Sequence, residues 1–290
     1  MGSNLWGNLK LASANGAVYG GYPYSRNQWF VGSSDSDPIP VPLSAAQRVG
    51  TIGEMLALMV PGDVGYLGPG AYDEGNLVVP ATLTNITLIG AGNRGSVFIE
   101  PSTAGDEGLT VLADLVTLIN VGVADGGSGD FGLSVGNASV SPDRFRAYGC
   151  KFEGSAIGAR LYGAGDILLE DCEFAWANVG LQLRSNLVGF NTQIFVQGCR
   201  FHNNATVCLG EFANAQQVNN LQLLNNIFDQ LEDGTEPTDF ILLQDNANTG
   251  IISGNQFALA TNATAKLTIG TGLMWGPNGT EAGWSSARPA

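Results

Sequence analysis

The residues of this chain that could carry out chemistry gather in one short acidic stretch, Asp166, Glu170, Asp171 and Glu173. Two carboxylates about 5–10 Å apart across a glycosidic bond can act as the acid and the base or nucleophile of its hydrolysis. Acids that hold Ca²⁺ beside a basic proton abstractor would instead support a lyase reaction on a polysaccharide. Glu170 and Glu173 are the pair that we expect to point outward together, so they are the candidate catalytic residues.

The same acids also have a simpler interpretation as a solvated surface paired with Lys151 and Arg200. Exposed ion pairs of this kind are common and contribute at most about 1 kcal/mol each. No catalytic motif aligns with the acids elsewhere in the chain. We therefore favour the solvated surface and predict no catalytic residue, with Glu170 and Glu173 as the alternative.

Other residues that could bind a ligand give weaker signals. His202 is the only histidine and the cysteines lack CxxC spacing, so neither a metal site nor a cofactor is predicted. The cysteines are expected to be reduced and buried as small apolar side chains. The glycine-rich stretch 90–96 joins two predicted strands and is interpreted as a turn, since no helix follows it to bind a phosphate. Trp176 and Tyr162 could stack on sugar rings, although packing is the simpler explanation for both.

The acidic stretch lies within a phrase that recurs every 22 to 29 residues. Each copy has apolar residues at its first and third positions, then a turn residue, and then Cys or Asn followed two positions later by Phe. Alternation at period two predicts a strand, and a unit this short cannot bury its own apolar face, so the copies must stack. The predicted fold class is all-β, a right-handed parallel β-helix. The copies end at Phe152, Phe174, Phe201, Phe228 and Phe257.

Stacking places equivalent side chains in columns at a spacing of about 4.8 Å. We expect one interior column of the five phenylalanines and a second of Cys150, Cys172, Cys199, Asn226 and Asn255. The residue between the two columns points outward and reads Lys151, Glu173, Arg200 in successive copies. The outer face is therefore predicted to carry alternating charges.

The composition of the chain limits the classes of partner that it is expected to bind. The 290 residues include 44% hydrophobic and 13% charged residues, and the formal net charge is −14 with only three lysines. No basic face exists to meet phosphates, so nucleic-acid binding is not expected. The N-terminus lacks a signal-peptide pattern and no run of about 18 apolar residues occurs, so we expect no membrane contact and synthesis in the cytoplasm.

The chain divides into four predicted parts. Residues 1–43 are rich in aromatic residues and proline without periodicity, and they form either an arm that lies on another surface or a segment packed along its own β-helix. Residues 44–62 have capping-box spacing at Ser44–Gln47 and predict a short helix that caps the first coil. The β-helix proper is expected over 63–258, followed by a C-terminal cap or tail over 259–290.

Two phrases after the predicted helix carry a family resemblance. Residues 62–72 read Gly-Asp-Val-Gly-Tyr-Leu-Gly-Pro-Gly-Ala-Tyr, and residues 83–92 end in Leu-Ile-Gly-Ala-Gly. With the preceding helix, they resemble the pectate-lyase-like, or pectin-lyase-like, β-helix superfamily over about residues 44–258. The resemblance implies the fold, but its members include polysaccharide lyases, hydrolases, epimerases and virus structural proteins, so it leaves the function open.

One outward column departs from the polar pattern. Leu168 and Phe195 are expected to lie side by side on the outer surface, with Tyr148 close by. An exposed apolar patch on a soluble solenoid usually marks an interface. The resemblance to virus β-helices implies that this interface joins three copies in a closed homotrimer.

These features lead to a functional hypothesis. The chain is expected to be a non-enzymatic structural protein of a bacteriophage virion, a homotrimer that decorates or cements the capsid or attaches to another part of the particle. Its partners would be the major capsid protein or other virion proteins. The alternative is a tailspike-like protein that binds or cleaves bacterial surface polysaccharide. The arm residues expected to attach it are Trp6, Tyr22, Tyr24, Trp29 and Phe30.

Overall fold

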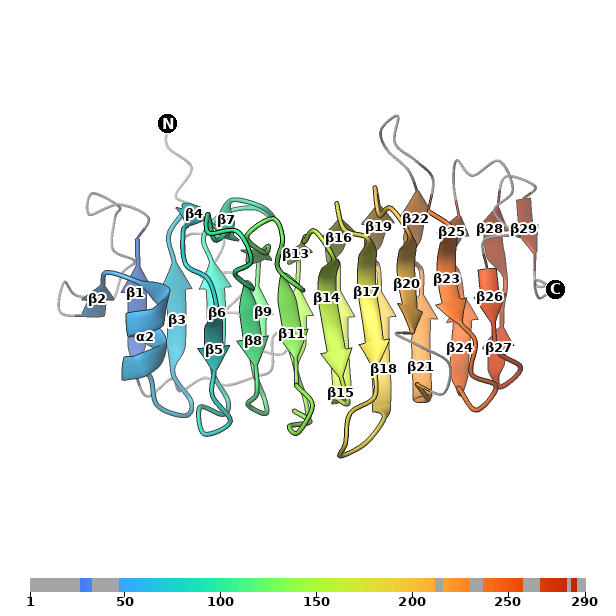
Figure 1. Ribbon diagram of the computed structural model, residues 1–290, viewed down its shortest axis with the longest axis horizontal. Coiled ribbons are helices and arrows are strands. Elements are labelled where there is room, and N and C mark those ends of the chain that lie inside the picture. Colours follow the sequence, from blue (N-terminus) through green and yellow to red (C-terminus); the bar gives the residue numbers. More distant parts are fainter. Residues whose placement is uncertain are drawn as a thin grey trace.

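The computed structural model is a parallel β-helix, as the repeat predicted. It describes residues 27–32, 47–211, 216–229, 237–257, 267–280 and 283–285. Successive coils each add one strand to each of three sheets, called sheets A, B and C. The strands follow one another along the axis in chain order, except that the strand Arg48–Val49 lies at the outer edge, beyond Gln28–Val31 (Figure 1). Within the described ranges, the pairings between strands are parallel except the antiparallel pairing of Asn278–Thr280 with Gly283–Ser285 in sheet B.

The strands of the described residues are given in the order in which they neighbour one another. Sheet A contains β2 (Arg48–Val49), β1 (Gln28–Val31), β3 (Val64–Leu67), β6 (Thr87–Gly90), β9 (Thr117–Ile119), β12 (Arg146–Tyr148), β15 (Gly165–Glu170), β18 (Asn191–Gln197), β21 (Val218–Leu224), β24 (Gly250–Ser253) and β27 (Leu273–Trp275). Sheet B contains β29 (Gly283–Ser285), β28 (Asn278–Thr280), β25 (Gln256–Phe257), β22 (Ile227–Asp229), β19 (Arg200–His202), β16 (Glu173–Ala175), β13 (Lys151–Phe152), β10 (Gly122–Val123), β7 (Val97–Ile99) and β4 (Gly70–Tyr72). Sheet C contains β26 (Leu267–Ile269), β23 (Asp239–Leu243), β20 (Val207–Glu211), β17 (Val179–Arg184), β14 (Ile157–Tyr162), β11 (Leu133–Val135), β8 (Leu109–Val111) and β5 (Leu77–Val79).

The five phenylalanines of the repeat form one interior column. Each side chain is fully buried, and each is paired in register with the next along sheet B. The centroids of successive rings are separated by 5.4, 4.6, 4.7 and 4.9 Å, and the last three pairs are stacked. The column thus follows the strand spacing, as expected from in-register coils.

The second interior column consists of three cysteines followed by asparagines, and both residue types can donate to a carbonyl oxygen of the preceding coil. The Cys199 thiol donates to Leu169 O at 3.4 Å, and the Asn226 amide donates to Val196 O at 2.9 Å. Asparagine also offers an acceptor, so Asn226 Oδ1 accepts the main-chain N–H of Cys199 at 2.9 Å. The ladder of Asn226 and Asn255 continues to Asn278, beyond the predicted end of the β-helix. All four cysteines are free and buried, and burial raises the pKa of Cys150 and Cys199.

The N-terminal strand belongs to the β-helix itself. β1 pairs with both β2 and β3, and Phe30 is fully buried. The buried carboxylate of Asp63 anchors this strand, because it accepts the main-chain N–H of Asn27 at 3.0 Å and the indole N–H of Trp29 at 3.1 Å. Of the predicted attachment residues, Trp29 packs against the interior core, and Phe30 is buried with the Arg48 guanidinium 5.4 Å from its ring centroid. The other three, Trp6, Tyr22 and Tyr24, lie outside the described residues.

The N-terminal helix is shorter than the predicted 44–62. It is α2 (Ile52–Leu58), and its N-cap is Thr51, whose hydroxyl accepts the N–H of Glu54 at 3.0 Å. α2 begins after Arg48–Val49 because these two residues pair with β1 as a strand. The cap of α2 is the Thr51–Glu54 spacing, whereas Ser44 lies outside the described residues. Met55 packs directly against the backbone of Gly65 in β3, where a side chain would clash with the Met55 sulfur at 2.6 Å. The helix thus fills space inside the first coil.

We predict that Phe201→Ala lowers the free energy of unfolding by about 3–5 kcal/mol, because the rings of Phe174 and Phe228 hold the cavity open. Chemical denaturation monitored by circular dichroism measures this loss. The matched control is Phe190→Ala, since Phe190 is 46% exposed and its removal should change stability by only about 0.5 kcal/mol. Equal losses in the two variants would contradict the interior column.

Candidate functional site

The candidate carboxylates flank the corner between sheets A and B. Glu170 ends β15 and Glu173 begins β16, with a turn at Asp171–Cys172 between them. Asp171 makes this corner possible by adopting a left-handed conformation with φ of 52°. Cys172 points into the core, so Glu173 beside it points outward. The prediction placed both acids outward, and the structure sets them on the two sides of one corner.

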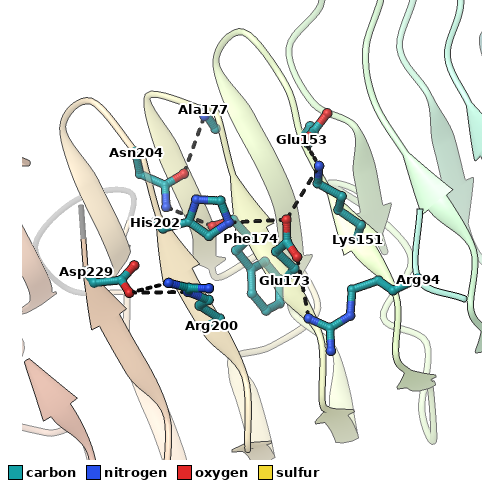
Figure 2. Close-up of polar contacts among 10 residues, drawn as sticks. All are labelled: Arg94, Lys151, Glu153, Glu173, Phe174, Ala177, Arg200, His202, Asn204 and Asp229. Atoms are coloured by element: carbon teal, nitrogen blue, oxygen red, sulfur yellow. Dashed lines mark hydrogen bonds and ion pairs between the residues drawn. The ribbon is translucent and has the colours of Figure 1, made fainter. Parts of the chain in front are cut away.

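Glu173 is the centre of a charged cluster on the outer face of sheet B (Figure 2). Its Oε1 lies 3.4 Å from Lys151 Nζ and 3.2 Å from His202 Nε2, and its Oε2 lies 3.5 Å from Arg94 Nη1. Lys151 also pairs with Glu153 at 2.5 Å. Both carboxylate oxygens of Glu173 are therefore occupied by donors of this chain.

This environment fixes the charge of Glu173. The hydrogen bond from His202, with the charges of Lys151 and Arg94, lowers the pKa of Glu173 to about 2, against the effect of burial. A glycoside hydrolase needs one carboxyl group that is protonated and can donate to the leaving oxygen. Glu173 stays ionised near neutral pH and cannot be that donor.

A second ion pair lies on the neighbouring strands. Arg200 donates from Nε at 3.2 Å and from Nη2 at 2.7 Å to Asp229 Oδ2. The sequence predicted that Arg200 pairs with Glu173, its register neighbour. Its guanidinium instead points away from Glu173, toward Asp229 on the following coil. The pairing leaves Asp229 Oδ1 buried without a hydrogen-bond partner. His202 Nδ1 is likewise buried without one, and His202 is the register partner of Asp229.

His202 and Asp229 were missed as site residues although the sequence holds the signal. Both directly follow the phenylalanine of their copy, and they form a second outward column of Glu153, Ala175, His202 and Asp229. Extending the aligned phrase by one residue past Phe would have revealed this column. Diagonal contacts between the two outward columns, such as Glu173 to His202, are within reach of long side chains but are not specified by alignment alone.

A polar hollow with a volume of about 370 Å³ lies next to the cluster. Arg94 belongs to both, since it borders the hollow and contacts Glu173. Glu170 lines the hollow and accepts a hydrogen bond from the Gln197 amide at 2.9 Å. We call the hollow, together with Glu173, Arg200, His202 and Asp229, the polar strip. The hollow is lined by Gly92, Asn93, Arg94, Asn120, Tyr148, Gly149, Glu170 and Asp171.

The predicted interface residues separate in the structure. Leu168 and Phe195 are neighbours in register on the outer face of sheet A, and both are half-buried. Tyr148 is only 9% exposed and borders the hollow instead of extending the apolar pair. Leu168 and Phe195 thus form a small apolar surface, and Met274, 66% exposed, lies further along the same sheet.

Two classes of site are missing from the part of the chain that the structure describes. It contains no group of three or more His, Cys, Asp or Glu side chains that could hold a metal ion. None of its helices is long and apolar enough to cross a membrane.

No protein-family model matches the sequence, and no curated protein matches it. Solved structures match by fold. The pectin methylesterase from Aspergillus niger aligns over 87% of this chain and 85% of its own, with 16% identity and a TM-score of 0.54. A pectin methylesterase in complex with a hexasaccharide aligns over 79% of this chain and 78% of its own, with 12% identity and a TM-score of 0.56.

A pectate lyase, Pel9A, aligns with 81% of this chain and 62% of its own length, at 15% identity and a TM-score of 0.55. At these identities the likeness is one of fold alone. The chain therefore has the parallel β-helix architecture found in these pectin-processing enzymes.

We predict that Glu173 stabilises the fold near neutral pH and ceases to do so in acid. Its pKa in the folded chain, about 2, is below the ordinary value of 4.5, so the stabilisation is present above about pH 4.5 and is lost as pH falls toward 2. Glu173→Gln should therefore be less stable than wild type at pH 7, with a difference that shrinks toward pH 3. Urea titrations across this range measure it, and Glu100→Gln at an exposed position is the control. A pH-independent difference would argue against the charged cluster.

Proposed function

We propose that the chain binds a polysaccharide along the polar strip without cleaving it. The observation that carries this proposal is the continuity of hydrogen-bonding groups from the hollow, through Arg94 and Glu173, to the pair of Arg200 and Asp229. Equivalent side chains on successive coils recur at a spacing of about 4.8 Å along a rigid solenoid. Such a repeat suits a ligand that is itself a chain of repeating units.

The state of the carboxylates supports binding over cleavage. Both oxygens of Glu173 accept from Lys151, His202 and Arg94, and its low pKa keeps it ionised. A base or nucleophile at this position would first have to lose these contacts. Preorganised ion pairs on a rigid sheet are well suited to holding a ligand in a fixed position.

The fold comparison is consistent with this proposal. Proteins of the same architecture include a pectate lyase, and one pectin methylesterase was solved with a hexasaccharide bound. Fold alone does not carry a function from one protein to another, so the proposal depends on the polar strip of this chain.

A particle-associated structural role is the second candidate, and the apolar pair of Leu168 and Phe195 favours it. In this form the chain is a homotrimeric protein of a bacteriophage virion, bound to the major capsid protein or another virion protein. The two roles are compatible, because a tailspike-like protein both assembles with a particle and binds a bacterial surface polysaccharide.

For the first role, we expect saturable binding of purified protein to bacterial capsule or lipopolysaccharide in isothermal titration calorimetry. We also expect no new reducing ends and no unsaturated products on prolonged incubation, because Glu173 is already occupied by its partners. Product formation that disappears in Glu170→Gln or Glu173→Gln would contradict the non-catalytic assignment.

For the second role, we expect Phe195→Glu to convert an oligomer into monomers, since it buries a charge at the contact. Light scattering measures the mass, and Gln222→Glu, the next residue of the same column, is the matched control. An oligomer unchanged by Phe195→Glu would exclude this surface. Attachment to a particle is tested separately by deleting residues 1–26, which leaves the paired strand β1 intact. A shortened chain that still joined particles would remove these residues as the arm.

A further inference from the structure

Trp176 combines exposure with an unusual backbone. Its side chain is 48% exposed although it is large and apolar. Its φ is 57°, in the left-handed region that bulky residues rarely adopt. Strain of this kind persists only where the surroundings enforce it, and it is concentrated at functional sites.

The surroundings of Trp176 do enforce this geometry. The fully buried Asn204 accepts the N–H of Ala177 at 3.4 Å through Oδ1 and donates to Phe174 O at 3.0 Å (Figure 2). The carbonyl of Ala177 accepts the N–H of Ala205 at 2.7 Å. The turn carrying Trp176 is thus fixed on both sides of the indole by the next coil. A ring held in this way loses little conformational freedom when a ligand binds to it.

Trp176 lies beside His202, whose register partner on the following coil is Asp229. Its ring is edge-on to the His202 ring, with centroids 6.4 Å apart and planes at 82°. His202 and Asp229 are 5% and 6% exposed, and within the described residues His202 Nδ1 and Asp229 Oδ1 have no hydrogen-bond partner. In the neutral tautomer of His202 whose Nε2 donates to Glu173, Nδ1 is an acceptor. Buried acceptors without a donor in the described residues are satisfied by a group from outside them, such as a water molecule or a ligand hydroxyl.

The cations of this face are already neutralised. Arg94 and Lys151 contact Glu173, and Arg200 contacts Asp229. The net charge of the whole chain is −14. A polysaccharide bearing carboxylates would meet repulsion without a free cation to offset it. A hydroxyl-rich neutral sugar would meet none, and its hydroxyl groups are donors.

We propose that Trp176 is a stacking platform for a neutral sugar ring whose hydroxyl groups donate toward His202 and Asp229. The apolar C–H face of the ring packs on the exposed indole, and the polar edge is directed to the two acceptors. This assignment rests on the proposed function, and it adds the residue that positions the glycan and the chemical class of the glycan.

The test measures binding by isothermal titration calorimetry to neutral dextran, mannan and galactan and to acidic polygalacturonate and alginate. We expect wild type to bind a neutral member and Trp176→Ala to lose about tenfold in affinity for it, an amount typical of one aromatic contact. Trp176→Phe should retain part of the affinity. Phe190→Ala is the matched control, because Phe190 is equally exposed at 46% and should leave binding unchanged. Circular dichroism establishes that each variant is folded.

The possible failures are distinguishable. Wild-type affinity in a folded Trp176→Ala would overturn the stacking platform. Binding of wild type to an acidic polymer alone would overturn the neutral class while leaving the proposed function standing. An absence of binding to every polysaccharide, capsule and lipopolysaccharide included, would overturn the proposed function together with this inference.

Discussion

In-register stacking of the coils is the constraint on which the rest of this structure depends. The N–H and C=O groups of most strands bond to the coils before and after them, so each copy of the repeat must superimpose on its neighbours. Phenylalanine therefore meets phenylalanine, and cysteine or asparagine meets a carbonyl oxygen of the preceding coil. Asparagine strengthens the later coils because it supplies both a donor and an acceptor to the ladder.

The same in-register stacking also aligns the side chains on the outer face of sheet B. Outward residues flank Phe152, Phe174, Phe201 and Phe228, and stacking aligns them in two adjacent columns that are charged or polar except at Ala175 and Ile227. Glu173 thus meets Lys151 on one side and His202 on the diagonal, and Arg200 meets Asp229. The in-register strands fix the backbone positions from which these side chains extend. This occupancy of the central carboxylate is the basis on which we propose binding without catalysis.

The repeat was sufficient to predict the fold and the interior, because period and residue type determine which side chains stack. Features that depend on contacts distant in sequence were not predictable in this way. β1 joins the sheet through the buried Asp63, 34 residues from its partner Trp29. The helix begins at Ile52, after its N-cap Thr51, because Arg48–Val49 pair with β1. The candidate pair of Glu170 and Glu173 was located correctly on the surface. The diagonal contact of Glu173 with His202 depends on side-chain direction, which periodicity does not specify.

A crystal structure of the protein with a bound neutral oligosaccharide tests the central claim, that the outer face of sheet B is a glycan-binding surface built by the stacked coils. We predict a sugar ring parallel to the Trp176 indole, the chain continuing past Glu173 toward the hollow, and all side chains of the charged cluster unmoved. An oligosaccharide seated on sheet A or sheet C, or a Glu173 carboxylate released from His202 and placed at a glycosidic bond, would contradict it.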